Sequence, residues 1–503
     1  MEAVACERGR VVAVGASHET RRLAASPADI VDLGGHTVVP GFVDAHLHLH
    51  WLGLALERLR LGDAPSLAAC VERVAERAWK TPPGGWISGF GWNRNAWPEG
   101  RWPTRRDLDA VTGDRPTLLG STDGHLLWVN GAALRAAGID QDTPDPPGGA
   151  IVRDADGEPT GVLKENATAL VYAVEPPATD EERDGALTRA MEHAVGLGLT
   201  SVGAFEGPEV TAALSRLRDR GALRVRVTRH IAYAALDDAL ASGARGGDGD
   251  EWLRWGHLKL FADGTLGSQT ASMLEPFAGS ADNRGIPTLS SDALRVAAGR
   301  AAAGGIATAI HAIGDRANRA ALDALVSAPR VPAMPHRVEH AQLLHPDDLP
   351  RFAAAGIIAS MQPTHATSDR DTAERYWGAR CATAYAWRPL QESGATLAFG
   401  SDAPVETCDP LAGLYAAVAR HNRGDGRAPW RPELALSLPD ALRAYTVGAA
   451  AATGEEGRKG ILAPGYLADM AVLSDDICAG LDALERARVV CTIVGGKIVA
   501  GAL

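Results

Sequence analysis

Two patterns of hydrophobic and polar positions alternate over most of the chain, one typical of strands and one typical of helices. From residue 181 onward, short apolar runs alternate with alanine-rich stretches of helical spacing, such as "DALRVAAGRAAAGG". Strands that alternate with helices across short connections are typical of a parallel sheet. Together with "GFVDAHLH" at residues 41–48, these apolar runs predict eight strands, of which the other seven read "LTSVGAF", "RVRVTRH", "HLKLFADG", "ATAIHA", "RVEHA", "IIASMQ" and "LAFGSD".

Eight such strands predict an α/β fold, a (β/α)8 TIM-like barrel over residues 40–453. An open doubly wound sheet is the alternative, and the strand count and the lack of a glycine-rich phosphate fingerprint disfavour it. Residues of about 80–170 fall between the first two strands and are rich in Trp, Gly and Pro. They predict an inserted subdomain over the carboxyl ends of the strands, where barrel active sites lie.

The two ends of the chain have β-like patterns of their own, such as "RVVAVG" and "VVCTIVGGKIVAG". Both fall outside the eight barrel strands. We therefore predict that residues 1–39 and 454–503 form one small β-sandwich domain.

Composition narrows the class of protein and its partners. The chain has 503 residues, 46% of them hydrophobic, and its net charge of −12 argues against nucleic acid or an anionic membrane as partner. Its six cysteines are scattered without a C-x-x-C pair, which fits a reducing compartment. No leader and no apolar run of about 20 residues is evident. We expect a cytoplasmic protein that acts on a small molecule, with a homodimer as the expected assembly.

Metal-ligand side chains recur at the predicted carboxyl ends of the strands. One such histidine alone is more often an ordinary polar residue, but six candidates on five strands indicate a metal centre. Because side chains alternate along a strand, the first strand presents two imidazoles on one face. The candidates are His46, His48, Lys259, His311, His340 and Asp402.

Lys259 is the most unusual of these candidates, because its apolar neighbours turn it into the barrel, where an unpaired ammonium is costly. An ion pair with Asp263, on the same face, is one interpretation. The other is a neutral amine that carries a carboxyl group from CO2, which would bridge two metal ions. Glu165, in "TGVLKENA", is an alternative bridge.

Other residues are candidates for contact with a substrate. His125, in "STDGHLLWVN", either lines the pocket or caps a turn, whereas His50 is interpreted as a loop histidine. The tryptophans Trp92, Trp97, Trp102 and Trp128 indicate either an aromatic subsite or packing of the insertion. Among these we take His125 and Trp92 as candidate substrate contacts, together with Gln362 at the end of the seventh strand.

Several motifs together resemble the amidohydrolase superfamily, and most closely amidohydrolase family 3, which includes N-substituted formamide deformylases. They are "GFVDAHLHLH", "LKLFADGTLGSQTA", "HAIGDRAN", "RVEHAQLLHPDDLPRFAAAGIIASMQPTHATSD" and "LAFGSDAPVETCDPLAGLYAAV". The resemblance covers nearly the whole chain. It implies a metal-dependent hydrolase whose ligand pattern falls on the six residues named above.

Two departures from the family pattern stand out. Relatives begin with a further β segment, so we expect that the start of this chain is truncated or misassigned. Relatives commonly have arginine where this chain has Gln269. If that arginine touches substrate, Gln269 is a substrate contact whose specificity has shifted.

The expected reaction is cleavage of a non-peptide C–N bond, of amide, N-formyl or N-acyl type, by a metal-bound hydroxide. One or two divalent ions are expected, with Zn2+ as the first choice over manganese, iron or nickel. His46, His48 and Asp402 would hold one ion and His311 with His340 the other, bridged by Lys259. Asp402 and His340 are the catalytic candidates, with Asp402 moving the proton.

Two alternatives belong to other functional classes. A heterocycle deaminase of the superfamily typically carries a glutamate three residues after the fifth-strand histidine, where this chain has Gly314, followed by Asp315. A non-catalytic scaffold typically loses metal ligands, and all six are present here. Amide hydrolysis is therefore favoured.

Overall fold

Eight parallel strands form the central sheet of the computed structural model, which describes residues 2–26, 30–57 and 59–502. Their order in space is the order of the chain, so each strand pairs with the next one along the sequence. Every predicted barrel strand is present. The strands are β4 (Phe42–Leu47), β11 (Leu199–Ala204), β12 (Arg226–Ala232), β13 (Leu253–Phe261), β14 (Thr308–Ala312), β15 (Arg337–His340), β16 (Ile358–Met361) and β17 (Leu397–Phe399).

The first and last strands meet and nearly close the barrel. The Asp402 backbone N–H donates to the His46 carbonyl over 2.7 Å, and the His48 N–H donates to the Ala403 carbonyl over 2.9 Å. An open doubly wound sheet would reverse its strand order at a switch point, and this sheet does not. The bonds also bring two predicted metal-ligand segments together.

Helices pack around the outside of the sheet, because their alanine- and leucine-rich faces are buried against the strands in one large hydrophobic core. The longest is α7, whose start is fixed by a capping box between Thr179 and Glu182. The helices of the barrel and its loops are α2 (Leu49–Ala55), α7 (Asp180–Gly196), α8 (Pro208–Asp219), α9 (Leu236–Ala241), α10 (Ser291–Ala303), α11 (Asp315–Ser327), α12 (Leu349–Ala355), α13 (Pro363–Ser368), α14 (Arg370–Trp377), α15 (Trp387–Glu392), α16 (Pro410–Ala419), α17 (Leu438–Arg443) and α18 (Ala449–Ala451).

The segment between β4 and β11 forms its own six-stranded sheet, as the sequence predicts. It begins at Leu59, earlier than the predicted start near residue 80. Its strands are β5 (Leu59–Arg60), β6 (Ile87–Trp92), β7 (Thr117–Ser121), β8 (Leu126–Val129), β9 (Gly149–Arg153) and β10 (Pro159–Glu165), and its helices are α3 (Leu67–Lys80), α4 (Arg105–Thr112), α5 (Gly131–Ala136) and α6 (Ala169–Tyr172).

The two ends of the chain share a four-stranded sheet, in which β3 (Thr37–Pro40) pairs with β18 (Met470–Leu473). The sheet continues through β19 (Val489–Val494) and β20 (Lys497–Gly501), and α19 (Leu481–Arg486) lies between β18 and β19. A separate hairpin of β1 (Ala3–Glu7) and β2 (Arg10–Gly15) is followed by α1 (Ser17–Thr20). The boundaries of a terminal domain stay a prediction.

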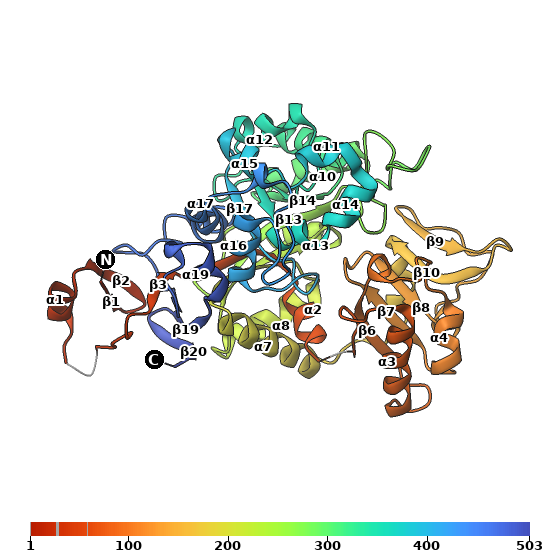
Figure 1. Cartoon of the computed structure of the whole chain (residues 1–503), viewed down its shortest axis with the longest axis horizontal. Helices are drawn as coiled ribbons and strands as arrows, with labels where there is room; N and C mark the ends of the chain where they lie inside the picture. Colours follow the sequence, from red (N-terminus) through yellow and green to blue (C-terminus); the bar gives the residue numbers. More distant parts are fainter. Residues whose placement is uncertain (1, 27–29, 58, 503) are drawn as a thin grey trace.

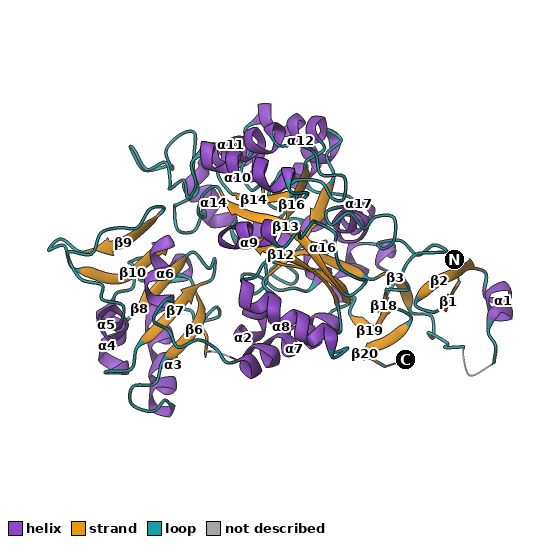
Figure 2. Ribbon diagram, turned by 180° about the vertical axis from the view of Figure 1, so that it is seen from behind, coloured by secondary structure: helices purple, strands orange, loops and turns teal. Residues whose placement is uncertain are grey.

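The terminal sheet and the inserted sheet lie on opposite sides of the barrel (Figure 1 and Figure 2). The insertion is therefore free to face the carboxyl ends of the strands while the terminal sheet does not approach them. Within the described ranges, every helix is too short or too polar to cross a lipid bilayer.

Candidate metal centre

His46, on β4, is held by a buried carboxylate behind it. Its Nδ1 lies 2.6 Å from Glu339 Oε2, and both side chains are almost completely buried. This contact fixes the ring and directs Nε2 toward Asp402 Oδ1, at 3.4 Å. A carboxylate behind an imidazole is the usual support of a metal-ligating histidine.

The ring of His48 is also held through Nδ1, in this case by a backbone carbonyl. Its Nδ1 lies 2.8 Å from the Phe205 carbonyl oxygen, and its Nε2 lies 3.2 Å from Asp402 Oδ1. One nitrogen from each of the two histidines and one oxygen of Asp402 lie within 4.8 Å of one another. The structure therefore brings these three predicted ligands together.

Asp402 lies just beyond β17 in a left-handed backbone conformation, with φ of 59°. Asp44 holds the adjoining loop, since its carboxylate accepts hydrogen bonds from Ser401 and from the His46 N–H. Burial alone would raise the pKa of Asp402, but the His46 and His48 imidazoles outweigh burial and lower that pKa. Asp402 is thus an anion facing a group of imidazoles.

A second group of ligand atoms shares Asp402 and includes His365, a residue that the sequence analysis did not single out. One nitrogen each of His340 and His365 and one Asp402 oxygen lie within 4.8 Å of one another. His340 Nδ1 lies 2.8 Å from Gln362 Oε1, so Gln362 stands behind His340. His365 lies on α13, three residues after the strand-end Gln362, and strand-end reasoning does not reach it.

Lys259 and His311 line the same cavity but make other contacts. The Lys259 ammonium lies 4.4 Å from the Phe205 ring centre, and burial lowers its pKa to about 8. In the described ranges no ion pair joins Lys259 to Asp263, so that interpretation is wrong. The Asp263 carboxylate instead accepts three backbone N–H groups, from Ser272, Ile313 and Gly314, and burial raises its pKa to about 7.

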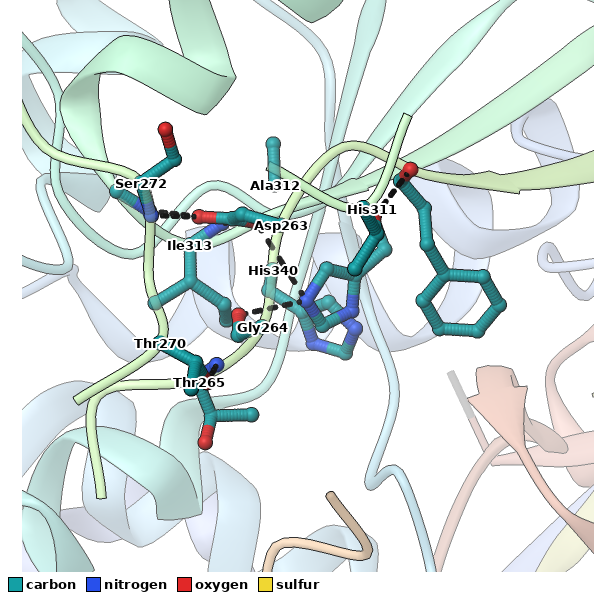
Figure 3. A network of polar contacts seen from close by, with 12 residues as sticks. Asp263, Gly264, Thr265, Thr270, Ser272, His311, Ala312, Ile313 and His340 are labelled. Carbon is teal, nitrogen blue, oxygen red and sulfur yellow. Dashed lines mark hydrogen bonds and ion pairs between the residues drawn. The ribbon is translucent and has the colours of Figure 1, made fainter. Parts of the chain in front are cut away.

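His311 lies beside this loop rather than beside Asp402. Its Nε2 is 3.1 Å from the Gly264 carbonyl oxygen and 3.6 Å from Asp263 Oδ1 (Figure 3). Its ring packs against the His340 ring at 4.6 Å between centres. Asp315 follows Gly314, which stands where a deaminase carries its glutamate, and the Asp315 carboxylate accepts the Leu274 N–H.

The insertion contributes a histidine–glutamate pair to the cavity. His125 Nδ1 lies 2.6 Å from Glu165 Oε2, and Thr270 donates to Glu165 Oε1 over 2.5 Å. Burial works against a charged His125, but Glu165 and Asp123 outweigh it and raise its pKa to about 9. Glu165 is therefore engaged with His125, and its role as a metal bridge stays a prediction.

Two cavities of about 890 Å3 and 320 Å3 meet at the site. The larger lies between the insertion and the barrel. The smaller is lined by His46, His48 and Lys259 with the aromatic side chains of Trp51, Tyr233 and Phe261. Both cavities are lined by Asp123, His125, His311, His340 and Asp402.

The remaining candidates for substrate contact lie at the walls of these two cavities or behind them. Trp92 borders the larger cavity, but its ring packs on Trp97 and Trp128 in the core of the insertion. Trp102 stacks under the Arg94 guanidinium. Gln269 and Gln362 are not among the residues that line either cavity. The interpretation of His50 as a loop histidine is wrong, because α2 begins at Leu49, two residues after β4 ends, and includes His50. Substrate contact by Trp92, Gln269 and Gln362 stays a prediction.

The residues at the site fit a divalent cation. His46 Nε2 and His365 Nε2 are buried and lack a hydrogen-bond partner within the described ranges, which is costly unless something else satisfies them. Imidazole nitrogens beside a carboxylate form a donor set suited to zinc and related metals. An eight-stranded α/β barrel with such a group at its carboxyl end defines a class, the metal-dependent hydrolases.

Comparison with known proteins narrows this class. Residues 29–500 match the family model described as amidohydrolase family. YtcJ of Bacillus subtilis strain 168, an amidohydrolase by name, is 34% identical over 99% of this chain and 96% of its own length. An N-substituted formamide deformylase of Arthrobacter pascens is 29% identical over 99% and 94%. The chain belongs to the amidohydrolase family.

A solved structure agrees with this assignment. An uncharacterized metal-dependent hydrolase of Pyrococcus horikoshii OT3 is 31% identical and superposes with a TM-score of 0.75, over 93% of this chain and 92% of that one. The predicted family is therefore confirmed, as is the barrel of a metal-dependent hydrolase.

Proposed function

We propose that this protein hydrolyses a non-peptide C–N bond of amide, N-formyl or N-acyl type. The observation that carries the proposal is the placement of Asp402 Oδ1 at 3.2–3.4 Å from the Nε2 atoms of His48 and His46, at the open end of the barrel. The similarity to an N-substituted formamide deformylase supports the bond type.

His46, His48 and Asp402 would hold the first divalent ion. Such an ion supplies Lewis-acid chemistry, which makes water more acidic and polarises a carbonyl oxygen. The ionised Asp402 carboxylate accepts a proton from the attacking water and passes it to the leaving nitrogen. Each carboxylate oxygen has two lone pairs, so holding an ion does not exhaust its capacity.

His125 would contact the substrate from the insertion side. Glu165 orients the ring through Nδ1, which leaves Nε2 on the wall that both cavities share. A charged imidazole there donates a hydrogen bond to the carbonyl oxygen, where negative charge develops. The insertion thus supplies part of the site rather than only covering it.

Carboxylation of Lys259 and the choice of zinc belong to this proposal as well. Lys259 is buried and has no ion-pair partner in the described ranges, which is compatible with a carbamate. Mass spectrometry of the intact protein, with and without bicarbonate and metal, tests for an added CO2.

A product assay tests the reaction itself. Purified protein refreshed with zinc and bicarbonate is incubated with a pooled library of N-formyl amines, N-acyl amines, cyclic amides and amino-heterocycles. Release of an amine and an acid is the expected result. Replacement of an amino group by oxygen on an intact ring would overturn the proposal in favour of a deaminase.

A further inference from the structure

Arg94 is a half-buried cation on the wall of the larger cavity, just after β6 of the inserted segment. In the described ranges no carboxylate lies within ion-pair distance of its guanidinium, and its buried Nε has no hydrogen-bond partner. Burial outweighs the attraction of the more distant Asp123 and lowers the pKa of Arg94. Removing a guanidinium from water without an anion beside it is costly, so a ligand that supplies the anion is favoured here.

An aromatic ring holds this guanidinium in place. The guanidinium stacks over Trp102, with 3.7 Å between its central carbon and the ring centre. The Lys164 ammonium lies over the same ring, 4.8 Å from its centre. Burial and the nearby Arg94 lower the pKa of Lys164. The insertion therefore holds two neighbouring positive charges around one rigid ring.

The acidic side chains on the same cavity are engaged elsewhere. Asp123 accepts two hydroxyl groups through Oδ2, over 2.7 Å and 2.8 Å, and Asp369 accepts a tyrosine hydroxyl over 2.6 Å. Asp63 is paired with Arg73. Burial raises the pKa of Glu406 to about 7, so this carboxyl group is only partly ionised at neutral pH. Apart from the metal centre, the free charge on this wall is therefore that of the guanidinium.

The turn that carries Arg94 is fixed to the barrel. Its neighbour Asn95 donates through Nδ2 to the Gly267 carbonyl oxygen over 3.4 Å. Gly267 belongs to the loop after β13, and hydroxyl groups of this loop also donate to Asp123, two residues before His125. One loop thus holds both Arg94 and His125 in position beside the cavity.

We propose that Arg94 binds a carboxylate of the substrate, so that the protein acts on amides that also carry a carboxylate, such as N-formyl or N-acyl amino acids. The inference rests on the proposed function for the bond that is cleaved. The parallel N–H groups of a guanidinium match the two oxygens of a carboxylate. Because Arg94 and Asp402 line one cavity of about 890 Å3, the amide lies at the metal centre while the carboxylate lies at Arg94.

Matched substrates test this assignment in the zinc-loaded full chain. Each N-formyl or N-acetyl amino acid, in both enantiomers, is compared with the amino alcohol derivative that lacks the carboxylate. We expect kcat/KM of the wild-type protein to be at least about 10-fold higher for the carboxylates, as charged hydrogen bonds imply. Arg94→Gln should remove this preference, and Arg94→Lys, which keeps the charge without the fork, should reduce it. The exposed Arg106→Gln is the control and should keep it.

A binding measurement separates this site from the reaction. The probes are N-methylsulfonyl amino acids and the corresponding amino alcohols, whose sulfonamide replaces the amide and is not cleaved. Calorimetry should show at least about 10-fold tighter binding of the carboxylate probe to the wild-type protein, and equal binding of both probes to Arg94→Gln. Equal affinities in the wild-type protein, no binding of either probe, or a preference that survives Arg94→Gln would overturn the carboxylate site. If the preference holds but the library assay shows no amide cleavage, only the proposed reaction is overturned.

Discussion

At the scale of single residues, the site depends on how each side chain is held from behind. His46 rests on Glu339, His48 on a backbone carbonyl and His340 on Gln362. The contacts of His46 and His48 use Nδ1 and leave Nε2 facing Asp402. The His340 Nδ1 that contacts Gln362 also lies 3.9 Å from Asp402 Oδ2. None of these supports follows from spacing in the sequence, because the three supporting residues lie on or just after three different strands: Glu339 on β15, Phe205 after β11 and Gln362 after β16.

Asp402→Asn is the sharpest test of the proposed reaction at this scale. The change keeps the shape of the side chain but removes the charge that holds the ion and moves the proton. We expect kcat to fall by at least about 100-fold, with less metal bound. Steady-state kinetics and metal analysis measure this, with the exposed Asp156→Asn as control. Unchanged hydrolysis by the asparagine variant would contradict the assignment of Asp402.

At the scale of elements, the sequence predicts the barrel well, because each strand is an apolar run and five of the eight carry a candidate metal ligand at or near their carboxyl ends. His46, Lys259 and His311 all follow that rule. His365 does not, since it lies on a helix after the strand, and its burial depends on packing of α13 and α16 that no local pattern reveals. The insertion begins at Leu59, earlier than the sequence predicts, because β5 has only two residues and forms no apolar run.

The inserted segment packs tightly against the loop after β13. A Cβ added at Gly264 would lie 2.0 Å from Thr270 Oγ1 and 2.2 Å from Glu165 Oε1. Gly264→Ala must therefore displace Glu165, which orients His125. We expect kcat to fall by about 10-fold or more, since small misplacements of a catalytic group are costly.

The matched control for this prediction is Gly299→Ala on α10, where an added Cβ meets nothing within 4 Å. That change should leave kinetics unaltered and raise stability slightly, by about 0.5–1 kcal/mol, because alanine favours a helix. Equal kinetics for the two variants would show that the contact of Glu165 with this loop is unimportant.

At the scale of the whole molecule, buried ion pairs connect the barrel to the segments that follow it. Glu455 pairs with Arg254 over 2.8 Å and with the buried Lys459. Burial would raise the pKa of Glu455, but Lys459 and Arg254 outweigh it and lower that pKa to about 2. A lowered pKa means that the stabilisation is present above the ordinary value near 4.5 and is lost as the pH falls toward 2.

Glu455→Gln should therefore cost about 3–5 kcal/mol of unfolding free energy at pH 7, because it leaves a buried ammonium unpaired. As the pH falls from 5 to 4, the variant should also lose less unfolding free energy than the wild-type protein. This pH range lies within about one unit of the ordinary glutamate pKa. Urea unfolding at each pH measures both effects. Glu456→Gln, a change at the exposed neighbour, should behave as wild type. If the unfolding free energies of the Glu455→Gln and Glu456→Gln variants fell equally with pH, the role of Glu455 would be contradicted.

The terminal sheet is joined to the barrel by a second buried pair, between Arg226 on β12 and Asp469 just before β18. Their two hydrogen bonds measure 2.7 Å and 2.9 Å. The same Asp469 residue accepts the Gly41 N–H through its backbone oxygen, next to the start of β4. Because these contacts couple the sheet to the first and third barrel strands, we expect the two parts to unfold together.

A double-mutant cycle on this pair tests that coupling. Asp469→Asn alone should lower the unfolding free energy by about 3–5 kcal/mol, since it leaves a buried guanidinium unpaired. The double variant Arg226→Met with Asp469→Leu should lose less unfolding free energy than the sum of the single changes. The exposed pair of Arg10 and Glu251 is the control, with an expected coupling of about 0–1 kcal/mol. If the terminal sheet were instead an independent unit, calorimetry of Asp469→Asn would show a separate early transition, and the barrel with its metal centre would keep the unfolding temperature of the wild-type protein.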